Sequence, residues 1–229
     1  MNSQALLTGI VDTLRRDILR GVLKPGTPVK ERDTSTEMGV SRTPMREALR
    51  VLAEEGLITL RHARSPIVSP LDLKTVSDQT EVLITLERLS AKLACRHARD
   101  AELEQIETTM ERMQRDFDTF DTVTLFELDM SFHSQIAAAS QNASLTETHK
   151  LYLQRLWYPR FLAAAKRQSR ERVLTDHAAI LAPLLERDEV AAQKAVEQHL
   201  LYLADDIQEQ VKLVNSGLQS PSNTEKDTE

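Results

Sequence analysis

The sequence contains few of the residues that mark several classes of protein. Its 229 residues include one cysteine, six glycines and eight prolines, and aromatic residues make up 4%. A single cysteine, Cys95, excludes an intramolecular disulfide, and its apolar surroundings favour a buried thiol over a reactive one. The low glycine and proline content excludes collagen-like and globally disordered chains. Because aromatic residues are rare, aliphatic side chains must fill the core.

Long hydrophobic runs are also missing. No stretch approaches the roughly 18 to 20 apolar residues of a membrane span. The first twenty residues, MNSQALLTGIVDTLRRDILR, carry charges where a signal peptide needs an apolar run. We therefore expect a cytoplasmic protein with no membrane partner. The length suffices for two modest domains.

Charge is distributed unevenly along the chain. Overall, 29 basic and 35 acidic residues give a formal net charge of -6. Residues 1–70 carry 11 Lys and Arg against 8 Asp and Glu, whereas residues 71–229 carry 18 against 27. A local basic surface is what nucleic-acid binding requires. The first third of the chain is thus the candidate for contact with nucleic acid.

The first third has the pattern of a winged helix-turn-helix. Apolar spacing and helix stop signals predict three helices, over residues 5–20, 31–38 and 41–56. In the third, Ser41 is a suitable N-cap and Pro44 lies in the first turn, where its missing N–H is harmless. Two short β-rich runs, 57–60 and 67–68, then flank a polar tip. We assign residues 1–70 to a DNA-binding domain.

The remainder of the chain is predicted to be helical. Six helices are expected, over residues 74–97, 100–118, 122–140, 144–167, 170–186 and 189–213, separated by capping and turn residues. Residues 71–75 are predicted to be a linker and 76–214 an effector-binding and dimerisation bundle. The segment 215–229 has no apolar period and is predicted to be a disordered tail. The fold class is therefore mostly α: a winged helix-turn-helix followed by an all-helical bundle.

The third helix has a polar side suited to reading DNA. This side is formed by Arg42, Thr43, Arg46 and Arg50. Arginine can donate two hydrogen bonds to guanine, and the hydroxyls of Ser41 and Thr43 suit phosphates or base edges. The alternative is a solvated face whose arginines pair with acidic residues at helical spacing, namely Glu47, Glu54 and Glu55.

A longer motif surrounds this helix. The string PGTPVKERDTSTEMGVSRTPMREALRVLAEEGLI resembles the N-terminal signature of the GntR family of bacterial transcription regulators, with its PG turn, GVSRTP-x-REAL and EGL. The resemblance implies binding of double-stranded operator DNA as a homodimer. It assigns DNA contacts to Arg32, Arg42, Thr43, Arg46 and, on the wing, His62.

The chain departs from that pattern in two places. Thr34 and Ser35 replace the usual Leu-Ala of the second helix, which we expect to loosen its packing. Ala63 to Ser65 stand where a glycine is common in the wing, so the minor-groove contact of the wing is in question. Arg64 is a substitute phosphate contact there.

Four residues of the second domain form a candidate metal site. Asp129 and His133 are four residues apart and share a helix face. His177 and His199 are each embedded among apolar residues. Three imidazoles and a carboxylate suit Zn²⁺, Ni²⁺ or Mn²⁺ with positions left open for water or a ligand. The alternative, which the spacing alone favours, is three hydrogen-bonded core histidines.

The surrounding motifs also resemble a known domain. D-x-x-F-H, then Asn142, an H-x-x-I and a final H-L resemble the ligand-binding FCD domain of the FadR subfamily, over about residues 76–210. This implies that Asp129, His133, His177 and His199 bind a metal that holds a carboxylate effector. Six helices would favour the VanR-like branch. We interpret Asn142 as a helix C-cap, and His97 and His149 as surface or hydrogen-bonded residues.

Further pocket candidates are Arg88, Arg155, Tyr158 and Arg160, because arginine offers a planar fork for a second carboxylate. The alternative is that these arginines face solvent or neighbouring helices. Leu83 stands where family members often have an arginine, one turn before the glutamate that aligns with Glu87.

Together these features predict a transcription regulator of a metabolic operon that is controlled by a small organic acid. A repressor is favoured over an activator. Release of DNA and tighter binding on addition of the acid both stay open. One alternative is a metal-sensing regulator. Another is a metal-dependent enzyme. Against it, the D-x-x-F-H segment has no glutamate or other base placed as in H-E-x-x-H, and the sequence has no glycine-rich loop for binding phosphate.

Overall fold

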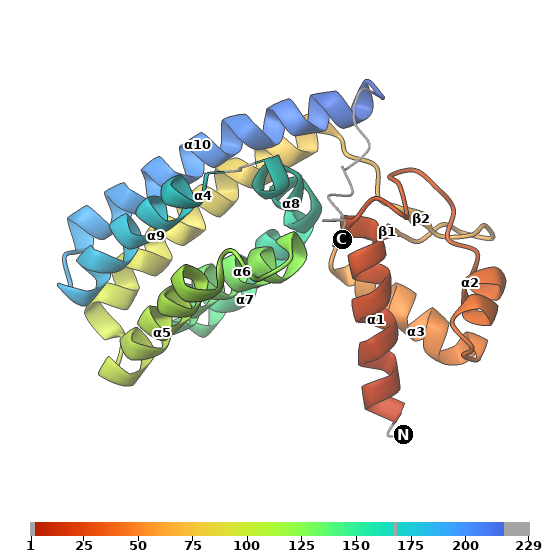
Figure 1. Ribbon diagram of the computed structural model, residues 1–229, viewed down its shortest axis with the longest axis horizontal. Helices are drawn as coiled ribbons and strands as arrows, with labels where there is room; N and C mark the ends of the chain where they lie inside the picture. Colours follow the sequence, from red (N-terminus) through yellow and green to blue (C-terminus); the bar gives the residue numbers. More distant parts are fainter. Residues whose placement is uncertain (1–2, 167–168, 218–229) are drawn as a thin grey trace. The chain divides into compact units, whose positions relative to one another are not determined.

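The chain is described by a computed structural model that covers residues 3–166 and 169–217 (Figure 1). It divides into two compact units. One contains the chain up to Asp72 together with the segment from Val211 onward, and the other contains Leu73–Gln210. Each unit is described by itself.

The first unit has the predicted winged helix-turn-helix. Its elements are α1 (Ser3–Leu19), α2 (Glu31–Glu37), α3 (Arg42–Glu54), β1 (Ile58–Thr59) and β2 (Ile67–Val68). The strands are antiparallel, with Ile58 opposite Val68. The core is aliphatic because the apolar stripes of α1 and α3 face each other. Its most buried side chains include Ile10, Leu14, Ile18, Met45, Leu49 and Leu52.

The PG turn attaches the segment before α2 to the wing. Gly26 has φ +78°, a left-handed conformation that favours glycine. Its N–H donates to the carbonyl of Val68 at 2.9 Å, and the N–H of Val68 donates to the carbonyl of Thr27 at 3.0 Å. The N–H of Val29 then donates to Pro66 at 2.8 Å. Residues 26–29 therefore pair with β2 and hold the wing.

The polar replacement in α2 is accommodated inside the helix. Ser35 is buried, and its hydroxyl donates to the carbonyl of Arg32 at 3.0 Å. A buried hydroxyl with a partner avoids most of the cost of desolvation. The looser packing that we expected from Thr34 and Ser35 stays a prediction.

The second unit is an all-helical bundle. Its helices are α4 (Leu73–His97), α5 (Asp100–Asp116), α6 (Thr122–Ala139), α7 (Ala143–Arg155), α8 (Trp157–Lys166), α9 (Arg170–Leu185) and α10 (Glu189–Asn215), which belongs to this unit up to Gln210. Helix α4 packs against α6 and α7, and α5 packs against α6. Ion pairs connect α4 to α10, including Arg96 with Glu189 at 2.6 Å.

The prediction of one helix over residues 144–167 is wrong. Within the described residues the chain makes two helices there, α7 and α8, which are separated at Leu156 with φ -94° and ψ 4°. Pro159 supplies the physical reason, because it has no N–H for the carbonyl of Arg155 and so disfavours a continuous helix. Over the residues that the structure describes, the bundle accordingly has seven helices, and helix number no longer favours the VanR-like branch.

The interpretation of Asn142 as a C-cap is also wrong. Helix α6 has its C-cap at Ser140, and Asn142 is the N-cap of α7. Its side chain accepts a hydrogen bond from the N–H of Leu145 at 3.1 Å. Asparagine is favourable at both kinds of helix end, so its presence alone did not identify the correct one.

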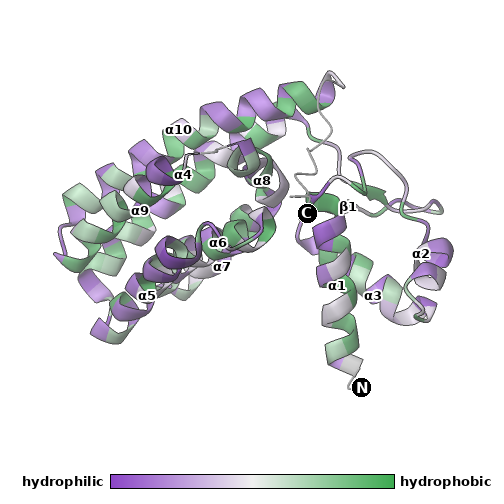
Figure 2. Ribbon diagram, viewed as in Figure 1, coloured by the Kyte–Doolittle hydropathy of each residue, from purple (hydrophilic) through white to green (hydrophobic). Residues whose placement is uncertain are grey.

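The predicted tail lies mostly outside the described residues, which end at 217. Asn215, the first residue of the predicted tail, is the last residue of α10. The side-chain amide of Asn215 donates to the carbonyl of Leu71 at 2.9 Å. Figure 2 shows hydrophobic and hydrophilic residues alternating in short blocks along the helices. In the part of the chain that the structure covers, no helix is long and apolar enough to cross a membrane.

Candidate metal centre and DNA-reading surface

The four predicted metal ligands come together in the bundle. Helix α6 carries Asp129 and His133, α9 carries His177 and α10 carries His199. The three histidines are buried, and each offers a ring nitrogen within 4.8 Å of the others. Residues that are far apart in sequence therefore present their donor atoms to one small volume.

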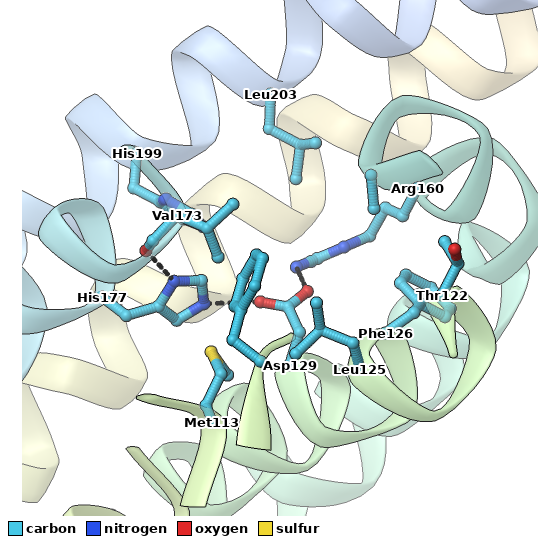
Figure 3. Close-up of a pocket in the computed structure, with 12 residues that line it drawn as sticks. Met113, Thr122, Leu125, Phe126, Asp129, Arg160, Val173, His177, His199 and Leu203 are labelled. Carbon is cyan, nitrogen blue, oxygen red and sulfur yellow. Dashed lines mark hydrogen bonds and ion pairs between the residues drawn. The ribbon is translucent and has the colours of Figure 1, made fainter. Parts of the chain in front are cut away.

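The hydrogen bonds of His177 determine the form of its ring. Its Nδ1 lies 2.8 Å from the carbonyl oxygen of Val173, which can only accept, so Nδ1 is the donor (Figure 3). In the neutral ring Nε2 then carries a lone pair. That Nε2 lies 2.5 Å from Oδ1 of Asp129, also a lone-pair atom. Two lone pairs repel at this distance, so the arrangement requires a proton between them, and a metal ion bound to both atoms at about 2.0 to 2.2 Å would hold them farther apart.

His133 is oriented by a buried carboxylate. Its Nδ1 lies 2.6 Å from Oε2 of Glu87, and its Nε2 lies 3.7 Å from Oδ1 of Asp129. A ligating histidine in a metal site usually directs its other ring nitrogen to a carboxylate or a carbonyl. His133 follows that rule through Glu87, and His177 follows it through Val173.

Glu87 connects several charged groups of the interior. It is only 3% exposed, and Oε1 lies 3.1 Å from Nη1 of Arg160 and 3.5 Å from Nε2 of His149. Arg160 also places Nη2 3.9 Å from Oδ2 of Asp129. Buried charges need partners. Glu87 and Asp129 therefore balance Arg160 and hold it beside the histidines.

The pKa values follow from these contacts. Burial alone would raise the pKa of Asp129, but the imidazoles of His177 and His133 lower it well below its usual range. Burial would lower the pKa of His133, but the carboxylates of Glu87 and Asp129 raise it to about 9. Burial lowers the pKa of His199 to about 4. At neutral pH these shifts leave Asp129 ionised and His199 neutral, so both can bind a cation, whereas His133 is protonated and would bind one only by releasing its proton.

A small pocket with a volume of about 60 Å³, partly open to solvent, adjoins this cluster. Its lining includes Asp129, His177, His199 and Arg160, whose side chains converge in Figure 3. The other lining residues are Met113, Phe117, Thr122, Leu125, Phe126, Ala164, Val173 and Leu203. One end of the pocket is therefore ionic, and most of the rest is apolar.

The predicted DNA contacts of the first unit are all exposed. Arg32 lies on α2, Ser41 precedes α3, and Arg42, Thr43 and Arg46 lie in the first turns of α3. Ser41 is the N-cap residue, but its hydroxyl makes no capping bond. Hydroxyl and guanidinium groups thus gather at the N-terminal end of α3.

The acidic partners of this surface differ from the alternative given by helical spacing. Arg46 pairs with Glu31 of α2 at 3.1 Å, and Glu55 pairs with Arg15 of α1 at 2.7 Å. Arg50 lies 3.7 Å from Glu47, as that alternative expects. The pair between Arg46 and Glu31 connects α2 to α3 on their exposed side.

The wing closes without a glycine. Ala63 takes the left-handed conformation, with φ 54°. The guanidinium of Arg61 donates twice to the carbonyl of Ser65, at 2.6 and 2.9 Å. His62 and Arg64 are exposed at this tip. These two hydrogen bonds from Arg61 hold the turn closed, although no glycine is present at its tip.

Comparison with known proteins decides the family. Residues 6–68 match the gntR family of bacterial regulatory proteins, and residues 78–202 match the FCD domain. The chain belongs to the gntR family. It carries the FCD domain of the FadR-like subfamily at its C-terminal side.

The relatives are transcription regulators. The chain is 30% identical over 206 residues to the HTH-type transcriptional repressor RspR of Escherichia coli, covering 89% of both chains. It is 28% identical over 214 residues to the Glc operon transcriptional activator of the same species, covering 83% of this chain and 84% of that protein. This gntR-family member is therefore a DNA-binding transcription regulator, and the enzyme alternative is wrong.

A solved structure has the same fold. E. coli McbR/YncC superposes with a TM-score of 0.70 at 18% identity, covering 93% of this chain and 99% of that one. At this identity the likeness concerns the arrangement of helices. It agrees with the predicted fold class of a winged helix-turn-helix and a helical bundle.

Of the predicted effector residues, only Arg160 lines the pocket of this regulator. Arg88 is half-exposed and pairs with Glu197 at 2.9 Å, and the guanidinium of Arg155 stacks over Tyr152 at 5.6 Å. Tyr158 is buried away from the pocket lining, and burial raises its pKa to about 12. Whether each of these residues reaches the pocket depends on the face of its helix on which it lies.

Sequence reasoning missed the role of Glu87 and His149. His97 is exposed, but His149 is buried against Glu87. A usable signal was present, because Glu87 lies four residues after Leu83 and four before Ala91, both buried in α4. A charged residue on an apolar face indicates a buried partner.

Proposed function

We propose that this gntR-family regulator represses a metabolic operon and responds to a small organic acid bound through a divalent metal. The proposed ligands are Asp129, His133, His177 and His199. The observation that carries the proposal is the convergence of three buried imidazoles, whose ring nitrogens lie within 4.8 Å of one another, beside the carboxylate of Asp129. A divalent cation that replaces the proton between His177 and Asp129 would be bound by all four donors.

The donor set fits a first-row metal. Imidazole suits Zn²⁺ and Ni²⁺, and a carboxylate with water suits Mn²⁺. Four protein donors leave open positions in an octahedral ion, and the adjoining pocket supplies the space for an acid to fill them. The metal would polarise and hold the carboxylate, while Glu87 keeps His133 in position.

The acid controls DNA binding if it has different affinities for two states of the regulator. A coupling of about 1 to 3 kcal/mol changes operator affinity roughly 5- to 150-fold, and operator DNA changes the affinity for acid by the same factor. A homodimer fits a palindromic operator, since a two-fold axis repeats the contacts in each half-site. Repression is favoured because the relative RspR is named a repressor.

The metal proposal is tested by the metal content of purified protein. We expect stoichiometric metal in the wild type and loss of that metal in the double variant His177→Ala, His199→Ala. His97→Ala is the matched control, because His97 is an exposed histidine of the same unit. Circular dichroism verifies that each variant folds. Wild-type metal content in a folded double variant would disprove the site.

A metal sensor is the second candidate, in which the ion itself is the signal. Measurements of operator affinity distinguish the metal sensor from the acid-responsive regulator. They are made on protein stripped of metal by a chelator, on metal-loaded protein, and on metal-loaded protein with organic acids. The pocket beside the ligands favours the acid, and a response to metal alone would favour the sensor.

A further inference from the structure

The pocket beside the proposed metal site is arranged along one face of α6. Thr122, Leu125, Phe126 and Asp129 all line it, at spacings of three, four and seven residues. At a rise of 1.5 Å per residue, Thr122 and Asp129 lie roughly 10 Å apart along the helix. Asp129 is at the ionic end, and Thr122 is exposed. The pocket therefore runs from the ligands toward a hydroxyl at the surface.

The middle of the pocket is apolar. Leu125 and Phe126 cover it from α6, and Met113, Val173 and Leu203 cover it from α5, α9 and α10 (Figure 3). None of these side chains can neutralise a charge or donate a hydrogen bond. A polar group placed between the two ends would lose its hydration without receiving a partner.

Arg160 can donate hydrogen bonds at the ionic end of the pocket, but its positive charge is already balanced by neighbouring carboxylates. Its Nη1 lies 3.1 Å from Glu87, and its Nη2 lies 3.9 Å from Asp129, so two carboxylates balance one guanidinium. Yet Nε and Nη2 are buried and have no hydrogen-bond partner within the described residues. These N–H groups can donate to one carboxylate at the metal. No lysine or second arginine is among the lining residues.

From this arrangement we infer that the effector is a monocarboxylate with an apolar body, an alkyl chain or an aromatic ring. Its carboxylate binds the metal and Arg160, and its body lies along Leu125 and Phe126 toward Thr122. Short dicarboxylates are rejected, because their second carboxylate falls in the apolar middle. The inference rests on the proposed metal-bound acid and adds its chemical class.

The test compares two series of acids on metal-loaded protein by titration calorimetry. Acetate, butyrate and hexanoate lengthen an apolar chain on one carboxylate. Each buried methylene contributes about fourfold in affinity, so hexanoate should bind over a hundredfold more tightly than acetate. Adipate has the same six carbons as hexanoate with a carboxylate at both ends. We expect it to bind at least a hundredfold more weakly than hexanoate.

Variants of α6 verify that the pocket selects the acid. Leu125→Arg places a cation in the apolar middle and should reverse the preference toward adipate. Leu128→Arg is the matched control, because Leu128 is also half-buried on α6 but does not line the pocket. If Leu125→Arg does not fold, Leu125→Ala serves instead. It should weaken hexanoate about tenfold and leave acetate unchanged.

The outcomes separate this inference from the proposed function. Tight binding of adipate or succinate, with hexanoate weaker or equal, would overturn the monocarboxylate and leave a metal-bound acid standing. If acetate binds and the affinity does not increase from acetate to hexanoate, the apolar body is likewise ruled out and the metal-bound acid is retained. A protein that holds metal but binds no acid of either series would overturn both.

Discussion

The two units of this regulator present their functional residues in opposite ways. In the first unit the predicted DNA contacts are exposed and lie close together in sequence on α2, α3 and the wing. In the second, the candidate ligands come from three helices, and the three histidines among them are buried while Asp129 is partly exposed. A surface that reads DNA must stay accessible, whereas a site that holds an ion needs donors around one point. The first can be encoded locally, and the second depends on packing.

Two arginines show the energetic side of this difference. Arg46 has a side chain that is 58% exposed, and its pair with Glu31 can be exchanged for DNA. Arg160 is 1% exposed and pairs with Glu87 in the interior. Exposed pairs contribute about 0 to 1 kcal/mol, whereas removing one partner of a buried pair costs about 3 to 5 kcal/mol. The same residue type is thus exposed and exchangeable in one unit, where it is the predicted DNA contact, and fixed in the interior of the other.

The largest expected effect comes from Glu87. Glu87→Ala leaves Arg160 without its closest partner, so the free energy of unfolding should fall by about 3 to 5 kcal/mol in urea titrations. Glu87→Gln keeps the shape and should mainly weaken metal affinity, by roughly 10- to 100-fold, because His133 loses its orienting carboxylate. Glu197→Gln, at a half-exposed pair with Arg88, is the control. Equal stability of Glu87→Ala and the control would contradict a structural role for the buried cluster.

A smaller effect, confined to DNA binding, is expected at Arg46. Arg46→Ala should weaken binding to a mapped operator by about 1 to 3 kcal/mol, measured by fluorescence anisotropy. Its unfolding should change by less than about 1 kcal/mol, since the pair with Glu31 is exposed. Arg50→Ala, on the same helix and paired with Glu47, is the comparison. Unchanged operator affinity in Arg46→Ala would remove this residue from the readout.

The smallest effect concerns the thiol of the bundle. Burial, reinforced by Glu189 and Asp188, raises the pKa of Cys95 from 9.0 to about 11. Because the folded state holds its proton more tightly, this contribution to stability is present below pH 9 and is lost as the pH rises toward 11. We expect alkylation by iodoacetamide to be slow at pH 8 in the native protein and fast in urea. Equal rates would show that the thiol is accessible.

The DNA-binding unit was largely predictable because its signals are local. The PG turn, Ser41 before α3 and the two β-rich runs each determine the conformation of a few neighbouring residues. The closing of the wing by Arg61 was not predicted, because the loss of a glycine does not reveal which side chain replaces its role. Likewise, spacing along one helix proposed acidic partners for Arg46 on α3, but its partner lies on α2.

In the bundle, the helices were predictable but their ends were less so. The division between α7 and α8 was missed although Pro159 marks it, and Asn142 was assigned to the wrong helix end. The convergence of Asp129, His133, His177 and His199 was expected only through resemblance to the FCD domain. Spacing alone also allowed unconnected core histidines, since separations of many residues specify no distance.

The sequence by itself determined the class of each unit, the polar face of α3 and the residue types available to bind a metal. Periodicity, caps and turns act over a few residues, and these features depend on nothing more distant. Only the tertiary structure decided that Glu87 lies between His133 and Arg160, that Arg160 and neither Arg88 nor Arg155 reaches the pocket, and that the pocket is apolar between its ends. Those facts depend on which helix faces meet, and packing of the whole bundle sets that.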